Sequence, residues 1–225
     1  MNDLLVIVPS RGRPDSIRRL LDAMDATCKG DTELLVGCDD DDPSLGEYPE
    51  GPEYDVNTGL RGVVAHFNAL SAPRTGDYRF MGALGDDFVP RTEGWDVAVM
   101  EALEKTPFAY GDERFPGRAP GESVCHIFTR SEVVSALGYL GPPVFRHMFV
   151  DNAWKAWGEA CGTTFLDGVV IEHLHPAAGK APQDETYTRT APFMGPDRQA
   201  WDAYQAGGLV ADIGKIRACL LLTTC

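Results

Sequence analysis

The stretch LLVIVPSRGRPDSIRRLLDAMDA, residues 4–26, indicates how this chain folds. Its first five residues are a continuous aliphatic run, which is typical of a parallel β-strand covered on both faces. A loop with glycine and proline follows, and from Asp15 onward apolar residues recur at helical spacing. Strand, loop and helix in this order predict one half of a βαβ unit.

The same alternation continues along the chain. Apolar runs predict further strands at 33–38, 78–84, 108–111, 124–129 and 164–174. Helical spacing predicts helices at 60–71, 95–104, 132–140 (with Ser131 as its cap), 151–160 and near 196–206. We therefore expect an α/β fold with a mostly parallel central sheet flanked by helices.

Length, composition and charge limit the classes of protein to which this chain can belong. The 225 residues are enough for one main domain, and no apolar run approaches the ~20 residues of a membrane span. The six cysteines show no metal or disulfide spacing, and the N-terminus lacks a secretory signal, so we expect a cytoplasmic protein with reduced thiols. The net charge of −14 disfavours nucleic acid and anionic membranes as partners, unless a local basic patch binds nucleic acid.

Three of the predicted strands end on polar residues, in the stretches PSRGR, CDDDD and GDD. In open parallel sheets, ligands bind beyond the carboxyl ends of the strands, so these stretches are expected to meet at one crevice. They would supply arginines for phosphate, carboxylates for a ribose or base, and carboxylates for a divalent metal. Taken alone, Asp86 and Asp87 are as typical of a structural role, in a turn or in the first turn of a helix, as of a ligand site.

Two later stretches carry further candidates. In VVIEHLHP, residues 169–176, His173 and His175 are two apart in a predicted strand and share one face, where they could complete a metal shell or be half-exposed. Asp151 in FVDNAW opens a predicted helix, where an aspartate commonly caps free amides. No single stretch predicts a function, so the functional inference must come from all of them together.

The order of these features over residues 4–190 resembles the GT-A fold glycosyltransferases, and is most similar to family 2 enzymes and to small bacteriophage-type versions. The residues that carry the resemblance are VIVPSRGRP, GCDDDD, LGDDFVPRTEGWD, VDNAW and EHLHPAAGK. The family's acidic motif is Asp-x-Asp, and here Leu84 stands where its first acid would be, which favours Asp86 as a metal ligand. The resemblance implies a catalytic domain over 1–190, with a nucleotide-binding half (1–90) and an acceptor and metal half (91–190), followed by a helical extension (191–225).

The resemblance also implies roles for single residues. Asp151 is the expected general base. The expected metal ligands, for Mn²⁺ or Mg²⁺, are Asp86, Asp87, His173 and His175. The expected nucleotide and donor residues are Pro9, Ser10, Arg11, Arg13, Asp39, Asp40, Arg61, Asn68, Asp87 and Lys180.

These residues predict a metal-dependent, inverting glycosyltransferase that uses a nucleotide sugar, with a UDP-sugar favoured by the resemblance. The acceptor hydroxyl could belong to a protein, a glycan, a small molecule or a modified DNA base. The loop 175–189 is expected either to order over the donor or to be an ordinary surface loop. Two alternatives stay open, a nucleotidyltransferase that forms a sugar nucleotide and a calcium-binding structural or adaptor protein with the acidic segment 39–55.

Overall fold

A computed structural model describes residues 2–57, 59 and 62–223. Its centre is an eight-stranded sheet with the order β3-β2-β1-β4-β7-β6-β8-β5. The strands are β1 (Asn2–Ser10), β2 (Thr32–Asp39), β3 (Glu53–Asn57), β4 (Tyr78–Ala83), β5 (Phe88–Pro90), β6 (Phe108–Asp112), β7 (Ile127–Arg130) and β8 (Thr163–His173).

Strand direction confirms the predicted mostly parallel sheet. β1 is parallel to β2 and to β4, β2 is parallel to β3, and β6 is parallel to β8. Only two of the described strands run the other way: β7 is antiparallel to β4 and β6, and β5 is antiparallel to β8. The carboxyl ends of β1, β2, β4, β6 and β8 consequently lie along one edge of the sheet.

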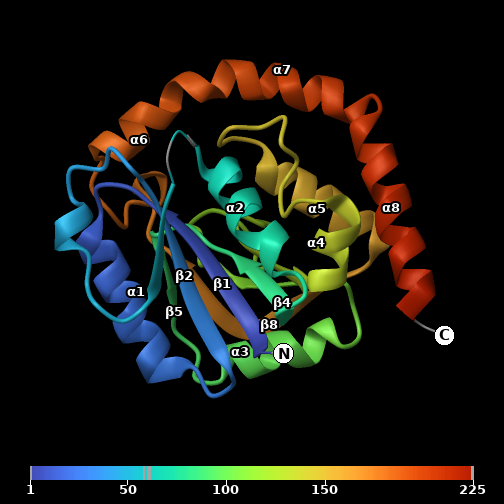
Figure 1. The fold of residues 1–225 in the computed structure, drawn as a ribbon, viewed down its shortest axis with the longest axis horizontal. Coiled ribbons are helices and arrows are strands. Elements are labelled where there is room, and N and C mark those ends of the chain that lie inside the picture. The colour runs from blue at the N-terminus through green and yellow to red at the C-terminus, as the bar shows by residue number, and fades with distance from the viewer. Residues whose placement is uncertain (1, 58, 60–61, 224–225) are drawn as a thin grey trace.

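Helices cover both faces of the sheet (Figure 1). They are α1 (Pro14–Thr27), α2 (Val63–Ser71), α3 (Trp95–Leu103), α4 (Ser131–Leu137), α5 (Val150–Cys161), α6 (Glu185–Thr190), α7 (Met194–Gln205) and α8 (Gly208–Thr223). Successive residues of β1 point to opposite faces, as a pleated strand requires. Leu4 and Val6 share a buried cluster with α1 and α3, whereas Leu5 and Ile7 share the other cluster with α2, α4 and α5.

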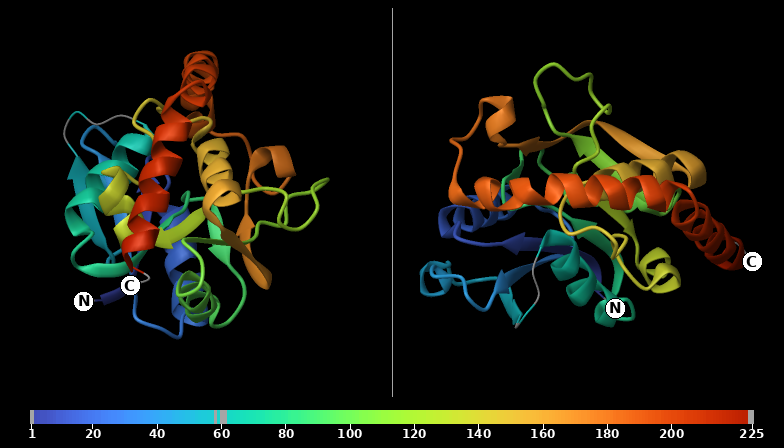
Figure 2. Two further views of the ribbon diagram at one scale, coloured as in Figure 1. Left: turned by 90° about the vertical axis from the view of Figure 1, so that its right-hand side faces the viewer. Right: turned by 90° about the horizontal axis from the view of Figure 1, so that it is seen from above.

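The helices α7 and α8 follow one another along the periphery of the domain, as the orange and red ribbons show (Figure 2). α8 packs against α4 and α5. Its Asp212, which is 3% exposed, accepts hydrogen bonds from the hydroxyls of Tyr139 (2.7 Å) and Tyr204 (2.6 Å). A buried polar network therefore fastens the last helix to the domain. Within the described residues, no helix is long and apolar enough to cross a membrane.

Several local predictions need correction. Ser131 is the first residue of α4 rather than its cap, and its hydroxyl is buried without a hydrogen-bond partner among the described residues. The strand predicted at 124–129 begins only at Ile127, because residues 123–126 turn inward toward a buried carboxylate. The strands β3 and β5 and the helix α6 were not predicted from the sequence.

Candidate functional site

A cavity of about 1010 Å³ lies at the edge where β1, β2, β4 and β8 end. It gathers residues that are far apart in the sequence. The sequence-predicted residues that line it are Pro9, Ser10, Arg11, Arg13, Asp39, Asp86, Asp87, Asp151, His173 and His175. The structure thus brings the predicted base, the predicted metal ligands and most of the predicted donor residues to one place.

Asp86 follows β4 and is 5% exposed. Its carboxylate accepts hydrogen bonds from the Ser10 hydroxyl (2.8 Å) and from Nη1 of Arg13 (2.8 Å). Burial raises the pKa of Asp86, and the neighbouring Asp87 raises it further, although Arg13 acts in the opposite direction. A Cβ at Gly85 would lie 2.7 Å from Oδ1 of Asp87, so a larger residue at this position would displace the Asp87 carboxylate.

Asp87 contacts a tyrosine hydroxyl and a histidine ring. Its Oδ2 accepts a hydrogen bond from the Tyr187 hydroxyl (2.7 Å) and lies 3.2 Å from Nε2 of His173. Burial opposes the ionisation of Asp87, but the contacts with His173 and Tyr187 outweigh it and lower its pKa. The His173 ring is stacked on Phe88, its partner in the β5–β8 pairing, with ring centroids 4.1 Å apart, which restricts the tilt of the ring plane.

Asp39, at the end of β2, contacts an arginine and a histidine. Nη1 of Arg11 lies 3.0 Å from its Oδ2, and Nε2 of His66 lies 2.8 Å from its Oδ1. Burial opposes ionisation, yet His66 and Arg11 together lower the pKa of Asp39. His66 was not selected from the sequence, because a single histidine on an apolar helix face gives no signal of its role.

Asp151 stands in the first turn of α5, and its Oδ1 accepts the backbone N–H of Asn152 at 2.9 Å. Burial raises the pKa of this carboxyl. The residue before the helix, Phe149, has a positive φ of 66°, a conformation that costs free energy in a non-glycine residue. The backbone at Phe149 therefore sets the direction in which α5 begins, next to the cavity.

The loop before Phe149 is fixed from α7. The carboxylate of Asp197, 2% exposed, accepts the backbone N–H groups of Arg146 (3.1 Å), His147 (2.9 Å) and Met148 (2.8 Å). Trp201 of α7 also stacks on Phe149, with ring centroids 6.4 Å apart. The C-terminal helices therefore help to place Asp151.

The segment around α6 contacts the loop between β1 and α1. Asp184, the N-cap of α6, accepts two hydrogen bonds of 2.8 Å from Arg13, and the Thr186 hydroxyl donates to the backbone oxygen of Arg11 (2.9 Å). The Arg13 guanidinium also lies 4.1 Å from the centre of the Tyr187 ring. The predicted loop 175–189 therefore contains the start of the helix α6 and packs against the residues that follow β1.

Three predicted donor residues lie elsewhere. The side chain of Asn68 forms hydrogen bonds with the backbone: it donates to Gly141 O (2.8 Å) and accepts the N–H groups of Leu140 and Gly141. Lys180 binds the Arg114 carbonyl (2.7 Å) and Glu172 (2.8 Å), and Asp40 is an exposed residue outside the cavity lining. Arg61 lies outside the described residues.

The donor set of the cavity fits a divalent cation of the Mn²⁺ or Mg²⁺ type. Carboxylate oxygens from Asp86 and Asp87 and one imidazole nitrogen from His173 are ligands that suit Mn²⁺. His175 adds a second imidazole, and burial, followed by His173, lowers its pKa, which favours the neutral ring that a metal requires. A further buried residue that the sequence did not single out, Glu113, lies with Cys125 and His173 such that one ligand atom of each is within 4.8 Å of the others.

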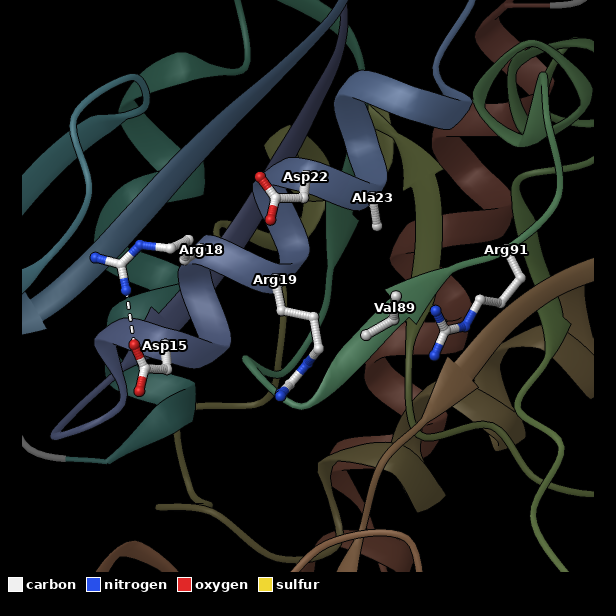
Figure 3. Close-up of a pocket in the computed structure, with 7 residues that line it drawn as sticks. All are labelled: Asp15, Arg18, Arg19, Asp22, Ala23, Val89 and Arg91. Carbon is white, nitrogen blue, oxygen red and sulfur yellow. Dashed lines mark hydrogen bonds and ion pairs between the residues drawn. The ribbon is translucent and has the colours of Figure 1, made fainter.

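A second hollow, of about 420 Å³, lies between α1 and β5. Figure 3 shows Arg19 and Arg91 on either side of Val89, and Arg18 paired with Asp15 at 2.6 Å. Arg91 is paired with Glu172 at 3.0 Å, and Arg19 donates to the Ser16 hydroxyl. These arginines are held by neighbours within the chain, and the hollow contains none of the predicted site residues.

Solved structures show what the fold is similar to. A mannosyltransferase from Pyrobaculum calidifontis, solved with GDP-Man and Mn²⁺, aligns over 100% of this chain and 77% of its own, with 12% identity and a TM-score of 0.56. TarS of S. aureus aligns over 86% of this chain and 43% of its own (13% identity, TM-score 0.57). A manganese complex from Mycobacterium tuberculosis aligns over 84% of this chain and 97% of its own (11% identity, TM-score 0.51).

The chain has the GT-A fold. At these identities the likeness is one of fold, and roles for residues rest on the geometry of the cavity. No family model matches the sequence, and no curated protein matches it.

Proposed function

We propose that this protein is a metal-dependent glycosyltransferase that moves a sugar from a nucleoside diphosphate sugar to a hydroxyl acceptor with inversion. The observation that carries the proposal is that Asp86, Asp87 and His173 line the same cavity as Asp151, whose carboxylate accepts the backbone N–H of Asn152. The proposal includes three further points. The protein would be related to family 2 and bacteriophage-type glycosyltransferases, its nucleotide would be UDP, and it would act in the cytoplasm (of the host, if phage-encoded).

The donor half of the cavity suits a nucleoside diphosphate. Departure of the diphosphate builds negative charge, and a bound divalent cation neutralises that charge. Arg11 and Arg13 line the same cavity and would bind phosphate oxygens once released from their carboxylate partners. Asp39 is ionised and accepts hydrogen bonds, so it can accept an N–H group of the base.

Asp151 is the proposed general base. A hydroxyl acceptor has a high pKa, so its proton must leave as the bond to the sugar forms, and a raised pKa makes a carboxylate a better proton acceptor. A single base and in-line attack give inversion at the anomeric carbon. The adjoining part of the cavity is lined by apolar side chains, including Val63, Phe149 and Phe193, against which an acceptor can pack.

The segment 175–189 is the proposed cover of the donor. Tyr187 and Thr186 line the cavity, and Asp184 holds Arg13. When phosphate and metal replace Asp184 and Tyr187 as partners of Arg13 and Asp87, the segment can rearrange over the donor and exclude water.

A thermal-shift experiment tests the proposal. UDP, GDP, CDP and TDP are each added with and without Mn²⁺, to the wild type and to Asp86→Ala. We expect at least one nucleotide to raise the melting temperature only when Mn²⁺ is present, and Asp86→Ala to abolish the rise. Stabilisation by Ca²⁺ alone, indifferent to nucleotides, contradicts the proposal and favours a calcium-binding protein. Formation of a sugar nucleotide from a nucleoside triphosphate and a sugar phosphate contradicts it in favour of a nucleotidyltransferase.

A further inference from the structure

The His173 ring has a carboxylate on each side. Nε2 faces Asp87 in the cavity, and the other nitrogen, Nδ1, faces Glu113, whose side chain is 1% exposed and which does not line the cavity. Glu113 directly follows β6, and its backbone oxygen accepts the N–H of His173 at 3.0 Å. The pairing of neighbouring strands therefore holds the two residues in register.

One oxygen of Glu113 is already engaged. Its Oε1 accepts the backbone N–H of Cys125 and lies 3.3 Å from Nδ1 of His126. Nε2 of His126 accepts the N–H of Gly111 at 3.0 Å, so the ring proton of His126 is on Nδ1, which lies near Glu113 but forms no hydrogen bond with the described residues. Burial opposes ionisation, but the contacts with His126 and Cys125 outweigh it and lower the pKa of Glu113 to about 2.

The other oxygen is left facing His173. Oε2 of Glu113 and Nδ1 of His173 are 4.0 Å apart, and both are buried without a hydrogen-bond partner among the described residues. Leaving a buried donor and a buried acceptor unpaired is unfavourable for folding. A small rotation of the imidazole pairs them with each other.

We infer that Glu113 is a positioning residue that accepts the Nδ1 proton of His173 and so directs the lone pair of Nε2 toward Asp87 and a bound metal. Histidines that bind metals commonly donate their second N–H to a carboxylate, which fixes the tautomer and the direction of the ring. This inference rests on the proposed function, because it takes His173 as a ligand of the diphosphate-bound cation.

A direct metal site formed by Glu113, Cys125 and His173 is the competing arrangement. Two observations weigh against it. Burial, followed by the charge of Glu113, raises the pKa of Cys125, which keeps its sulfur protonated, and a metal binds the thiolate. Oε1 of Glu113 is also engaged with Cys125 N–H, so only one carboxylate oxygen is available.

Glu113→Gln tests the inference with almost no change of shape. The amide oxygen must take the place of Oε1 to accept the N–H of Cys125, so the amide NH₂ group points at Nδ1 of His173. Nδ1 then becomes the acceptor, the proton moves to Nε2, and the lone pair for the metal is lost. We expect the dissociation constant of Mn²⁺, measured by electron paramagnetic resonance in the presence of a nucleoside diphosphate, to rise about 10- to 100-fold.

Two controls separate positioning from general damage. Asp96→Asn alters another fully buried carboxylate, which accepts the N–H groups of Lys29 and Gly30 away from the cavity, and should leave the Mn²⁺ dissociation constant unchanged. In a His173→Ala background, Glu113→Gln should have no further effect on Mn²⁺ binding. Glu113→Asp, which keeps the charge but withdraws the carboxylate from Nδ1, is the second variant if Glu113→Gln does not fold, and it should also weaken Mn²⁺ binding.

Three results overturn the inference. The first is a Mn²⁺ dissociation constant in Glu113→Gln within twofold of the wild type, and the second is a full effect of this change in the His173→Ala background. The third is a Co²⁺ complex of the wild type with an intense near-ultraviolet thiolate band that Cys125→Ser removes, because this shows direct ligation by sulfur. If the wild type itself binds no Mn²⁺ with any nucleoside diphosphate, the proposed function fails and the inference fails with it, which is distinct from a failure seen only in the variant.

Discussion

The hydroxyl of Tyr187 donates a 2.7 Å hydrogen bond to Oδ2 of Asp87, the same oxygen that faces His173. These two residues are 100 positions apart in the sequence. Tyr187 belongs to α6, so the segment that adjoins the donor side of the cavity occupies a position that a metal ligand needs. In the proposed metal site, a cation on Oδ2 would compete with this hydroxyl, which would couple the α6 segment to the metal.

Tyr187→Phe is expected to tighten Mn²⁺ binding. The change removes the competing hydrogen bond and keeps the ring beneath Arg13. A hydrogen bond to a charged group contributes about 1.5–3 kcal/mol when buried, and this hydroxyl is at the rim, so we expect a roughly 3- to 10-fold lower dissociation constant. Tyr139→Phe, which removes a hydroxyl from the buried carboxylate of Asp212, is the matched control. Weaker Mn²⁺ binding in Tyr187→Phe would show instead that the hydroxyl helps to hold the metal.

Asp151→Asn is expected to lower the rate of sugar transfer about 10²- to 10⁴-fold, the usual contribution of a general base. The amide keeps the size of the side chain and can still accept the N–H of Asn152, so the start of α5 should be preserved. Donor affinity, measured by calorimetry with Mn²⁺, should stay within a few-fold of the wild type. Normal transfer by this variant would exclude Asp151 as the base.

The pH dependence of transfer should report the same residue. Burial raises the pKa of Asp151, and the nearby charge of Glu113 acts in the same direction, whereas Arg118 opposes it. The base must be ionised, so kcat/KM is expected to fall as the pH decreases through a pKa above the ordinary value of about 3.9 for aspartate. The Mn²⁺ dissociation constant is measured over the same range as a control. If kcat/KM at low pH falls in parallel with Mn²⁺ affinity, the titrating groups are the metal ligands, and the assignment to Asp151 is contradicted.

The sequence predicted the fold class and the edge of the sheet where the polar residues meet, for a physical reason. Aliphatic runs such as residues 4–8 are buried on both faces in a parallel sheet, and the polar residues that follow must lie at its carboxyl edge. The strands β3 and β5 escaped prediction, since β3 alternates with acids at the edge of the sheet and β5 has three residues ending in Pro90.

The parts of the site that the sequence could not supply come from tertiary contacts. Tyr187 lies in a polar helix and Glu113 follows a short strand, so no hydrophobic periodicity points to either residue. Their roles depend on tertiary contacts, of Tyr187 with Asp87 and of Glu113 with His173. Asn68 shows the opposite case. It lies on a predicted helix, but its side chain is engaged by the backbone of Leu140 and Gly141, and it does not line the cavity.

Asp197→Asn is expected to separate the contribution of α7 to catalysis from its contribution to stability. Asp197 accepts the backbone N–H groups of residues 146–148, which lead into the strained Phe149 and then Asp151. An amide can accept fewer of these bonds and brings a donor toward them, so the loop should loosen. We expect a loss of about 1–3 kcal/mol in the free energy of unfolding, measured in urea, and a fall in kcat that exceeds the fall in donor affinity.

Asp212→Asn is the matched control for Asp197→Asn. Asp212 is an equally buried aspartate of the same pair of C-terminal helices, but its partners are Tyr139 and Tyr204, and none of the three lines the cavity. It should lose a similar free energy of unfolding and, at a temperature where both variants are folded, keep its kcat. If both changes lower kcat equally, α7 and α8 act on activity through stability alone. A single cooperative unfolding transition in both variants is expected if residues 191–225 belong to the same folding unit as the sheet.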